Sequence, residues 1–335
     1  GVKCINNKKV RKTLILIGVL AGFFLVGIIA LVLFTRGGQI NEPLPYSRSA
    51  RIFGTSVQES STVAEGIAEN LCVGASNNAL DGVDAQEGEM AGLFDIRNGE
   101  IPFSQNIYQQ KSAGRLAQLM TVLVAYETLD MDSSVTIEQE DIPYGADRTC
   151  GLSVGNVISG RQLLNAAAVY SAEDACLALA RAASGSASAF VESMNNKAKE
   201  LGMTNTSYTD PAGTDEEGQY TTVYDTYLLL NAILEHPDLT NTLGLSSYTL
   251  DYSRADGEQK QQWLSSDNLY VTGTASSPRG VTVLGGKMNA AAENNYAALL
   301  VQDNYGNPYV VIVLNTDSQV NLYERMEQMM EKLGG

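Results

Sequence analysis

Histidine, tryptophan and cysteine are scarce in this chain of 335 residues, which contains one histidine, one tryptophan and four cysteines. His236 is therefore the only candidate for a serine–histidine pair, and a metal site built from several histidines is excluded. The cysteines show no Cys-x-x-Cys spacing that would suggest zinc. We expect no cofactor and no metal.

Basic residues are also few. The chain has 22 Lys and Arg against 38 Asp and Glu, a formal net charge of −16. Six of the basic residues lie within the first 36 positions, where no acid occurs, so the rest of the chain is more acidic than this average. Since binding to nucleic acid depends on basic surfaces, we expect no nucleic-acid partner.

One long apolar run stands near the amino terminus. Residues 13–34 carry no charge, and as a helix they would span about 33 Å, the thickness of a bilayer core. Five basic residues precede the run, so the positive-inside rule predicts a cytoplasmic tail over 1–12, a transmembrane anchor over 13–34 and the remainder outside the cell. We expect a single-pass protein of the cell membrane with an extracellular C-terminal domain.

Beyond the anchor, residues 35–88 are mostly polar and predict a stalk with a short helix, and residues 89–335 predict a folded domain. Asn98-Gly99 between two apolar runs is typical of a β-hairpin. Apolar spacing and composition then predict helices, followed by strands and a last helix. The helices are expected over 115–129, 162–183, 187–201, 222–234 and 320–333, and the strands over 247–252, 280–284, 296–302 and 309–314. This order indicates an α+β fold in which helices cover an antiparallel sheet.

Three cysteines fall in the part that is expected to be extracellular. At most one disulfide can form among them, and Cys150 with Cys176 is the preferred pair. The alternative is that both are free and buried, which is common for cysteine.

The order of segments over residues 90–333 resembles the D-alanyl-D-alanine carboxypeptidases, low-molecular-mass penicillin-binding proteins whose fold is shared with class A β-lactamases. The resemblance rests on the hairpin before a helix carrying LMT, the stretch LLNAAAVYSAEDACLALA, the stretch LGMTNTSYTDPAGTDEEGQYTTVYD, and GVTVLGGK ahead of two strands. It implies a β-lactamase-like antiparallel sheet covered by helices, preceded here by one transmembrane helix.

Enzymes of this family use three motifs, and the first is SxxK. Its serine attacks the peptide carbonyl, and its lysine, one helical turn later, can act as the base. Alignment on LMT places Arg115 at the serine position and Gln118 at the lysine position. Arginine is neither nucleophilic nor deprotonated near neutral pH, and a glutamine amide is not a base. Neither residue can perform the expected step.

Ser112 is the nearest hydroxyl to these positions. A shifted nucleophile there would lie about 4.5 Å along the helix axis, too far for acyl transfer in the family geometry. The preferred interpretation is that Ser112 caps a helix.

The second motif, SxN, aligns with Ser171 and Glu173, and the third, KTG, aligns with Lys287, Met288 and Asn289. The serine of SxN and the lysine of KTG are retained, whereas the asparagine of SxN and the threonine and glycine of KTG are not. Ser171 and Lys287 are therefore the candidate ligand-binding residues, with no catalytic motif intact. One loss of selection explains three degenerate motifs more simply than independent changes.

The opposite charges of Arg115 and Glu173 predict an ion pair across the former cleft if the motifs converge, while the alternative is that both face solvent. The leading functional hypothesis is a pseudoenzyme that binds peptidoglycan peptides or acts as a scaffold at the cell wall of a bacterium. One alternative is an active serine-type D-Ala-D-Ala carboxypeptidase of peptidoglycan metabolism with a non-standard nucleophile such as Ser171. Another is a structural partner of a membrane protein.

Overall fold

The computed structural model describes residues 71–214, 218–290 and 295–334. The chain divides into two units, Gly1–Glu69 and Asn70–Gly335, and all the described residues belong to the second. The expected cytoplasmic tail 1–12, the expected membrane segment 13–34 and most of the expected stalk lie outside the described residues. Within the described ranges, none of the helices has the length and apolar character that crossing a membrane requires.

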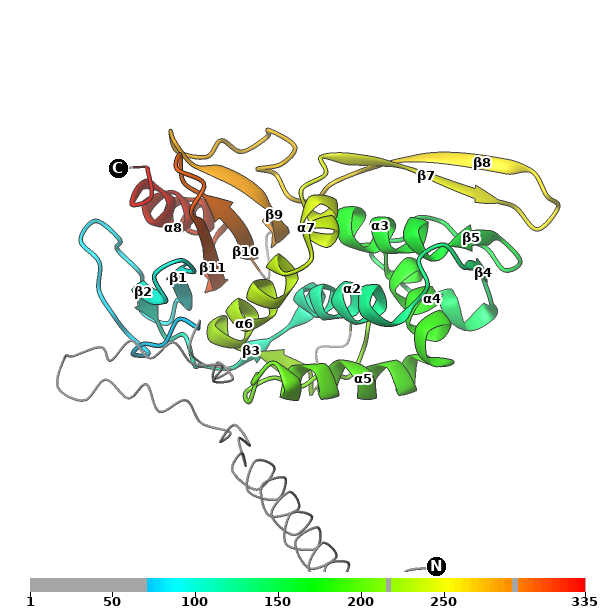
Figure 1. The fold of residues 1–335 in the computed structure, drawn as a ribbon, viewed down its shortest axis with the longest axis horizontal. Coiled ribbons are helices and arrows are strands. Elements are labelled where there is room, and N and C mark those ends of the chain that lie inside the picture. Colours follow the sequence, from blue (N-terminus) through cyan, green and yellow to red (C-terminus); the bar gives the residue numbers. More distant parts are fainter. Residues whose placement is uncertain (1–70, 215–217, 291–294, 335) are drawn as a thin grey trace, which may run out of the picture. The chain divides into compact units, whose positions relative to one another are not determined.

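A five-stranded antiparallel sheet forms the centre of the second unit, with the strand order β2-β1-β11-β10-β9 (Figure 1). Its strands are β1 (Ala91–Asp95), β2 (Glu100–Gln105), β9 (Thr282–Asn289), β10 (Asn295–Gln302) and β11 (Pro308–Thr316). The expected hairpin joins β1 to β2, and Gly99 supplies the positive φ of 67° in its turn. The expected antiparallel sheet covered by helices is confirmed.

Both faces of this sheet are buried, and alternate residues of its strands enter two different cores. On β11, Val310 and Ile312 belong to the larger core with most of the helices, whereas Val311 and Val313 pack against the last helix, α8 (Gln319–Glu331). This division follows from the two-residue period of a strand. Helices on both sides therefore hold the sheet rigidly, and its residues near the ends of β9 to β11 can be positioned accurately.

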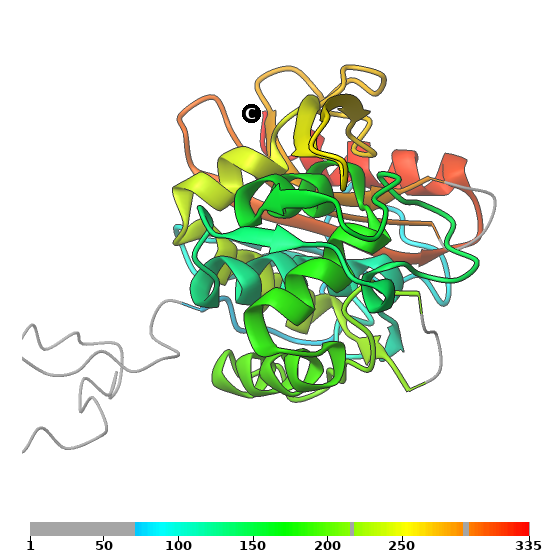
Figure 2. The ribbon, with the colours of Figure 1, turned by 90° about the vertical axis from the view of Figure 1, so that its right-hand side faces the viewer.

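Helix α2 (Ala117–Thr128) runs through the middle of the larger core and buries nine consecutive residues, 117–125. Other helices surround it, as Figure 2 shows from the side. They are α3 (Gly160–Tyr170), α4 (Glu173–Ser184), α5 (Ala187–Glu200) and α6 (Val223–Leu234), while α7 (Pro237–Leu243) packs against α3, α6 and β9. Two short 3₁₀ helices, η1 (Gly114–Leu116) and η2 (Gln139–Asp141), complete the set. A helix that is apolar on all sides is expected at such a central position.

A second antiparallel sheet flanks the helices. It consists of β4 (Ser134–Thr136), β5 (Val157–Ser159), β7 (Ser247–Ser253) and β8 (Gln259–Ser265), and a separate two-stranded ladder joins β3 (Lys111–Ser112) to β6 (Tyr220–Thr221). Strand β8 was not expected, because only Leu264 of its seven residues is buried and no apolar alternation marks it.

The single helix expected over 162–183 is instead two helices, α3 and α4, separated at Ser171. Ser171 adopts a left-handed conformation, with φ 59° and ψ 35°, that ends α3. Residues other than glycine visit this region rarely, and such positions cluster at functional sites. The alanine-rich sequence around the break gave no sign of it.

Residues 71–88 pack on the domain rather than extending the expected stalk. Asn78 exchanges backbone hydrogen bonds of 2.8 and 3.0 Å with Ser104 of β2, and Cys72 is fully buried, its amide donating to Tyr227 Oη at 2.8 Å. The folded domain therefore begins earlier than residue 89.

The expected disulfide between Cys150 and Cys176 is wrong, since both cysteines are free and buried. The Cys150 thiol donates to Asp174 Oδ1 at 3.3 Å, and the same oxygen accepts the Cys150 amide at 3.0 Å. Burial raises the pKa of both thiols, so they stay protonated. The sequence does not show that the Cys150 thiol donates a hydrogen bond to a buried carboxylate, that of Asp174.

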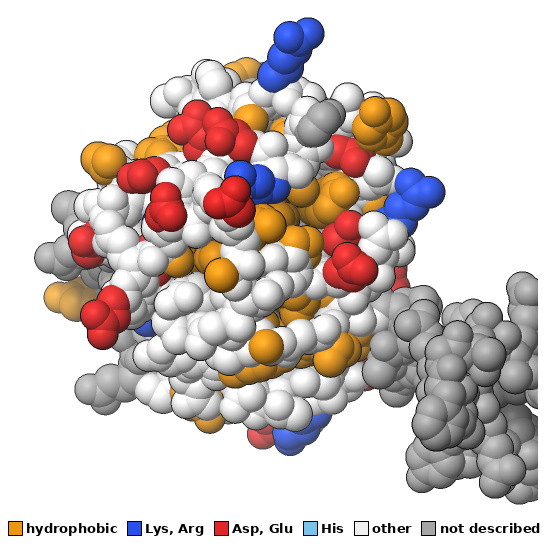
Figure 3. Space-filling model, turned by 90° about the vertical axis from the view of Figure 1, so that its left-hand side faces the viewer, with side chains coloured by type: hydrophobic (Ala, Val, Ile, Leu, Met, Phe, Trp, Pro, Cys, Tyr) orange, Lys and Arg blue, Asp and Glu red, His pale blue; other side chains and the backbone are white. Residues whose placement is uncertain are grey.

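The surface drawn in Figure 3 carries scattered acidic side chains and few basic ones, with apolar side chains between them. No broad basic patch lies among the described residues of this face.

Candidate functional site

A polar cavity of about 510 Å³ lies where the segment before α2 meets one end of the central sheet. Its walls come from residues 111–116, the loop 143–147, Gly213 with Thr214, and the adjoining ends of β9, β10 and β11. Glu173, at the start of α4, completes the lining. This volume is within the range that small-molecule sites usually have.

Gly213 shapes the cavity from the side of the 210–213 turn. It has a φ of 73°, and a Cβ there would lie 2.5 Å from the carbonyl oxygen of Gly114. Only glycine fits between these two backbones. The turn is therefore fixed against the segment that carries Arg115.

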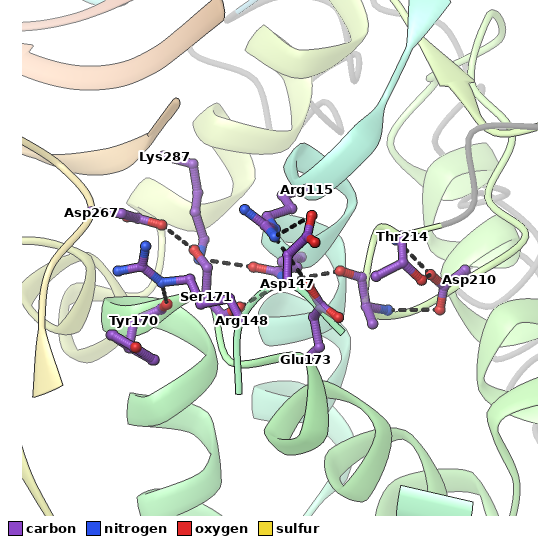
Figure 4. Close-up of polar contacts among 12 residues, drawn as sticks. Arg115, Asp147, Arg148, Tyr170, Ser171, Glu173, Asp210, Thr214, Asp267 and Lys287 are labelled. Carbon is purple, nitrogen blue, oxygen red and sulfur yellow. Dashed lines mark hydrogen bonds and ion pairs between the residues drawn. The ribbon is translucent and has the colours of Figure 1, made fainter. Parts of the chain in front are cut away.

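The expected ion pair between Arg115 and Glu173 is present. Arg115 Nη2 lies 3.1 Å from Glu173 Oε1 and 3.4 Å from Asp147 Oδ2, as Figure 4 shows. The Glu173 side chain is 1% exposed and that of Asp147 is 89% exposed. Arg115 thus holds a buried carboxylate at the cavity wall. Solvent screens its contact with Asp147.

Glu173 is only half satisfied by this pair. Its second oxygen, Oε2, is buried and has no hydrogen-bond partner. Burial raises the pKa of the carboxyl group, and the hydrogen bond and charge of Arg115, together with the backbone of Arg148, oppose that effect without cancelling it. The carboxylate at the cavity wall therefore has room for a further donor.

Behind this pair lies a second cluster around Lys287, which is fully buried. Lys287 Nζ donates to Ser171 Oγ at 2.6 Å, to the Ala167 carbonyl at 2.7 Å and to Gln118 Oε1 at 3.1 Å. Three acceptors match the three N–H groups of an ammonium. The cluster joins the sheet to α2 and to the junction of α3 with α4.

Gln118 acts in this cluster as a connector. Its amide nitrogen donates to the Ala212 carbonyl at 2.8 Å and to the Ser171 carbonyl at 3.3 Å, while its oxygen accepts from Lys287. Every polar atom of this buried side chain is therefore used. The residue at the lysine position of the first motif is now structural.

The Ser171 hydroxyl accepts a hydrogen bond from the Lys287 ammonium and donates one to Asp267 Oδ2. Desolvation lowers the pKa of Lys287, and the charge of Asp267 opposes that shift. The left-handed backbone of Ser171 stands at the point where its hydroxyl meets both groups. This connected network accounts for the break between α3 and α4.

Access separates the two clusters. Ser171 and Lys287, expected as ligand-binding residues, are each 0% exposed and neither lines the cavity. The prediction that Ser171 and Lys287 bind a ligand is therefore wrong, because all three N–H groups of Lys287 donate to acceptors inside the protein. Arg115 and Glu173 line the cavity instead.

Ser112 does not cap a helix as expected. It lies in β3, and Ala113 and Leu116 occupy the cap positions of η1 and α2 without a side-chain cap. Ser112 lines the cavity, and its hydroxyl is buried and has no hydrogen-bond partner. A serine placed here consequently has no base within hydrogen-bond distance.

Met288 and Asn289, at the end of β9, point in different directions. Met288 belongs to the smaller core beneath the sheet, where its sulfur accepts the Leu269 amide at 3.3 Å. Asn289 lines the cavity. Of these two degenerate positions, only Asn289 meets the space in which a ligand can lie.

Sequence reasoning missed Asp267 of the Lys287 cluster, Asp147, which contacts Arg115, and the cavity-lining residues Asn295 and Lys111. Asp267 follows the unexpected strand β8, and no motif marks it. Asn295 and Lys111 reach the cavity only through sheet pairing between distant segments. A single sequence carries no local signal for such placement.

The sequence profile of the D-alanyl-D-alanine carboxypeptidases matches residues 78–302, more than half of the chain. The chain belongs to this family. It is 31% identical over 192 residues to the D-alanyl-D-alanine carboxypeptidase DacF of Bacillus subtilis, covering 56% of this chain and 48% of that protein. It is 29% identical over 192 residues to DacC of Escherichia coli, covering 54% and 48%. The chain thus spans about half the length of these family members.

Solved structures agree on the fold. Penicillin-binding protein 5 of Haemophilus influenzae superposes with a TM-score of 0.65 at 19% identity, covering 74% of this chain and 71% of that one. DacD of Francisella tularensis gives 0.62 at 20% identity, covering 78% and 72%. In this fold the aligned motif positions form two groups, Arg115 with Glu173, and Gln118 with Ser171 and Lys287, as the hydrogen bonds above record.

We predict that Arg115 and Glu173 are energetically coupled. A double-mutant cycle with Arg115→Ala and Glu173→Ala should give a coupling free energy of unfolding of about 2 kcal/mol, because removing Arg115 alone leaves a buried charge unpaired. The measurement is chemical denaturation of the four proteins.

The exposed pair Arg254–Glu258 is the matched control, with a separation of 2.8 Å and side chains 47% and 64% exposed. Its coupling should be at most about 1 kcal/mol despite the shorter distance, since solvent screens it. Equal coupling in the two cycles would contradict the burial of the Arg115–Glu173 pair.

Proposed function

We propose that this chain is a catalytically inactive member of its family that binds a peptidoglycan peptide in the cavity and serves as a binding or scaffold module at the cell wall. Residues 13–34 would hold it in the cell membrane with the folded domain outside. The apolar run and the basic residues before it support this anchoring. One observation carries the proposal of inactivity: among the residues that the structure describes, the one serine that lines the cavity, Ser112, has no base within hydrogen-bond distance.

Ser171 has the hydrogen-bonding partners of a nucleophile but no access. Its hydroxyl contacts Lys287, whose lowered pKa would suit a base. Yet Ser171 is not among the residues that line the cavity, whereas Arg115 and Glu173 are. Since acyl transfer requires reacting atoms about 3 Å apart, a peptide carbonyl in the cavity cannot meet this hydroxyl.

Ser112 has the opposite defect. Ser112 lines the cavity, but its hydroxyl is buried and no group within hydrogen-bond distance can take its proton. Ser112 thus lacks the base on which serine nucleophiles of this family depend. Ser171 has a neighbouring base and Ser112 lies in the cavity lining, but neither serine has both. This favours a binding role over the alternative of an active carboxypeptidase.

We predict that fluorescent penicillin forms no covalent adduct with the purified chain, and that D-Ala-D-Ala peptides are not hydrolysed above the rate in buffer. The measurements are gel fluorescence, intact mass and release of D-alanine. An adduct or a turnover that disappears in Ser171→Ala or in Ser112→Ala would overturn the proposal and identify the nucleophile.

We further predict that restoring the motif groups at the cavity restores slow acylation. The fourfold variant Arg115→Ser, Gln118→Lys, Glu173→Asn and Asn289→Gly supplies the nucleophile, base, amide donor and open strand end. The introduced lysine would stand beside Lys287, and the repulsion between two ammonium groups lowers the pKa of one of them. Met288 stays unchanged because it packs in the core beneath the sheet.

Acylation by penicillin, followed by intact mass, should be at least about tenfold faster in the fourfold variant than in Arg115→Ser alone, which lacks the base. A fourfold variant that melts cooperatively but does not react faster than Arg115→Ser would contradict the alignment of the first motif on Arg115 and Gln118.

A further inference from the structure

Three residues that line the cavity each carry a buried side-chain atom without a hydrogen-bond partner: Ser112 Oγ, Glu173 Oε2 and Asn295 Oδ1. Among the described residues, only one other buried side-chain atom, Tyr323 Oη, shares this property, and Tyr323 does not line the cavity. Buried polar groups in folded proteins are normally paired, so three unpaired ones in one cavity indicate that something else satisfies them. Glu173 and Asn295 are 0% and 4% exposed.

The chemistry of these atoms defines what fits. A carboxylate oxygen and an amide oxygen can only accept hydrogen bonds, and a serine hydroxyl can accept one as well. The missing partner is therefore a donor with several N–H or O–H groups. A primary ammonium offers three donors and one positive charge, which also balances the carboxylate that Arg115 contacts through one oxygen only.

The cations near the cavity do not fill this role. Arg115 is directed at Glu173 Oε1 and Asp147, and Lys111 Nζ donates to Asn315 Oδ1 at 3.0 Å. Lys287 donates to three internal acceptors behind the cavity wall. The raised pKa of Glu173 agrees with a carboxylate whose charge is incompletely compensated.

We propose that the cavity binds its ligand through a primary ammonium group held against Glu173 Oε2, with Asn295 and Ser112 as further acceptors. The inference rests on the proposed function in that the ligand enters the same cavity. It differs in the charge that is recognised, because Glu173 stands where the second family motif has an amide. The ligand class is an amino acid or short peptide with a free amine.

Three probes separate the amine from the carboxylate: D-Ala-D-Ala, N-acetyl-D-Ala-D-Ala and D-Ala-D-Ala amide. Binding to the full chain in detergent is measured by calorimetry at pH 6.5, where the α-amino group is charged. We expect the two peptides with a free amine to bind at least about tenfold more tightly than the acetylated one, since hydrogen bonds to charged groups are the stronger ones.

Glu173→Gln should abolish this preference, because it removes the charge and keeps an oxygen for Arg115. Glu138→Gln is the matched control, since Glu138 also lies 3.1 Å from an arginine but is 59% exposed and outside the cavity lining. It should retain the preference. Asn295→Asp, which adds a second negative charge, should strengthen it, and this variant carries the test if Glu173→Gln does not fold.

Other results overturn the inference in distinguishable ways. Tighter binding of N-acetyl-D-Ala-D-Ala than of the amide would show recognition of the carboxylate, leaving the proposed wall-peptide binding intact. Failure of all three probes to bind would refute the ammonium site, and sedimentation with isolated cell-wall material would then decide the proposed function alone. Acylation by penicillin would refute inactivity without touching a measured preference for the amine.

Discussion

The buried ammonium of Lys287 is the constraint on which the rest of the site depends. A charge that is removed from water must find partners inside the protein or lose its proton. Lys287 has three acceptors on two segments: Gln118 on α2, and Ala167 and Ser171 in the last turn and at the end of α3. The glutamine on α2, the end of α3 and the left-handed backbone of Ser171 are consistent with this single requirement. Residues that resemble remnants of a catalytic motif are thus part of the core.

Arg115 and Glu173 complete this arrangement on the side of the cavity. Their ion pair occupies the wall between the ligand space and the buried cluster, so the retained serine and lysine are enclosed. The same pair leaves one buried carboxylate oxygen of Glu173, a residue that lines the cavity, without a hydrogen-bond partner. The proposed loss of catalysis and the proposed change of ligand preference would both follow from this one pair of charges.

Much of the fold could be predicted from the sequence. Asn98-Gly99 marked the first hairpin, apolar spacing marked α2, α6 and α8, and the resemblance placed three motifs that meet in space. The predictions failed where tertiary contacts decide local structure. The break at Ser171 follows from contacts with Lys287 and Asp267, which lie 116 and 96 residues away. The predicted disulfide is absent, and the Cys150 thiol instead donates a hydrogen bond to Asp174. Strand β8 was not predicted because its sequence has no apolar alternation.

The central claim is that Lys287 is sealed inside the protein behind the Arg115–Glu173 pair. Labelling of the folded chain with an amine-specific acylating reagent, followed by peptide mass spectrometry, tests it directly. Lys260, which is exposed on β8, should react readily, while Lys287 should remain unmodified until the protein is unfolded. Modification of Lys287 in the folded protein at a rate comparable with that of Lys260 would contradict the account, because it would show a lysine open to the cavity and free to take part in chemistry.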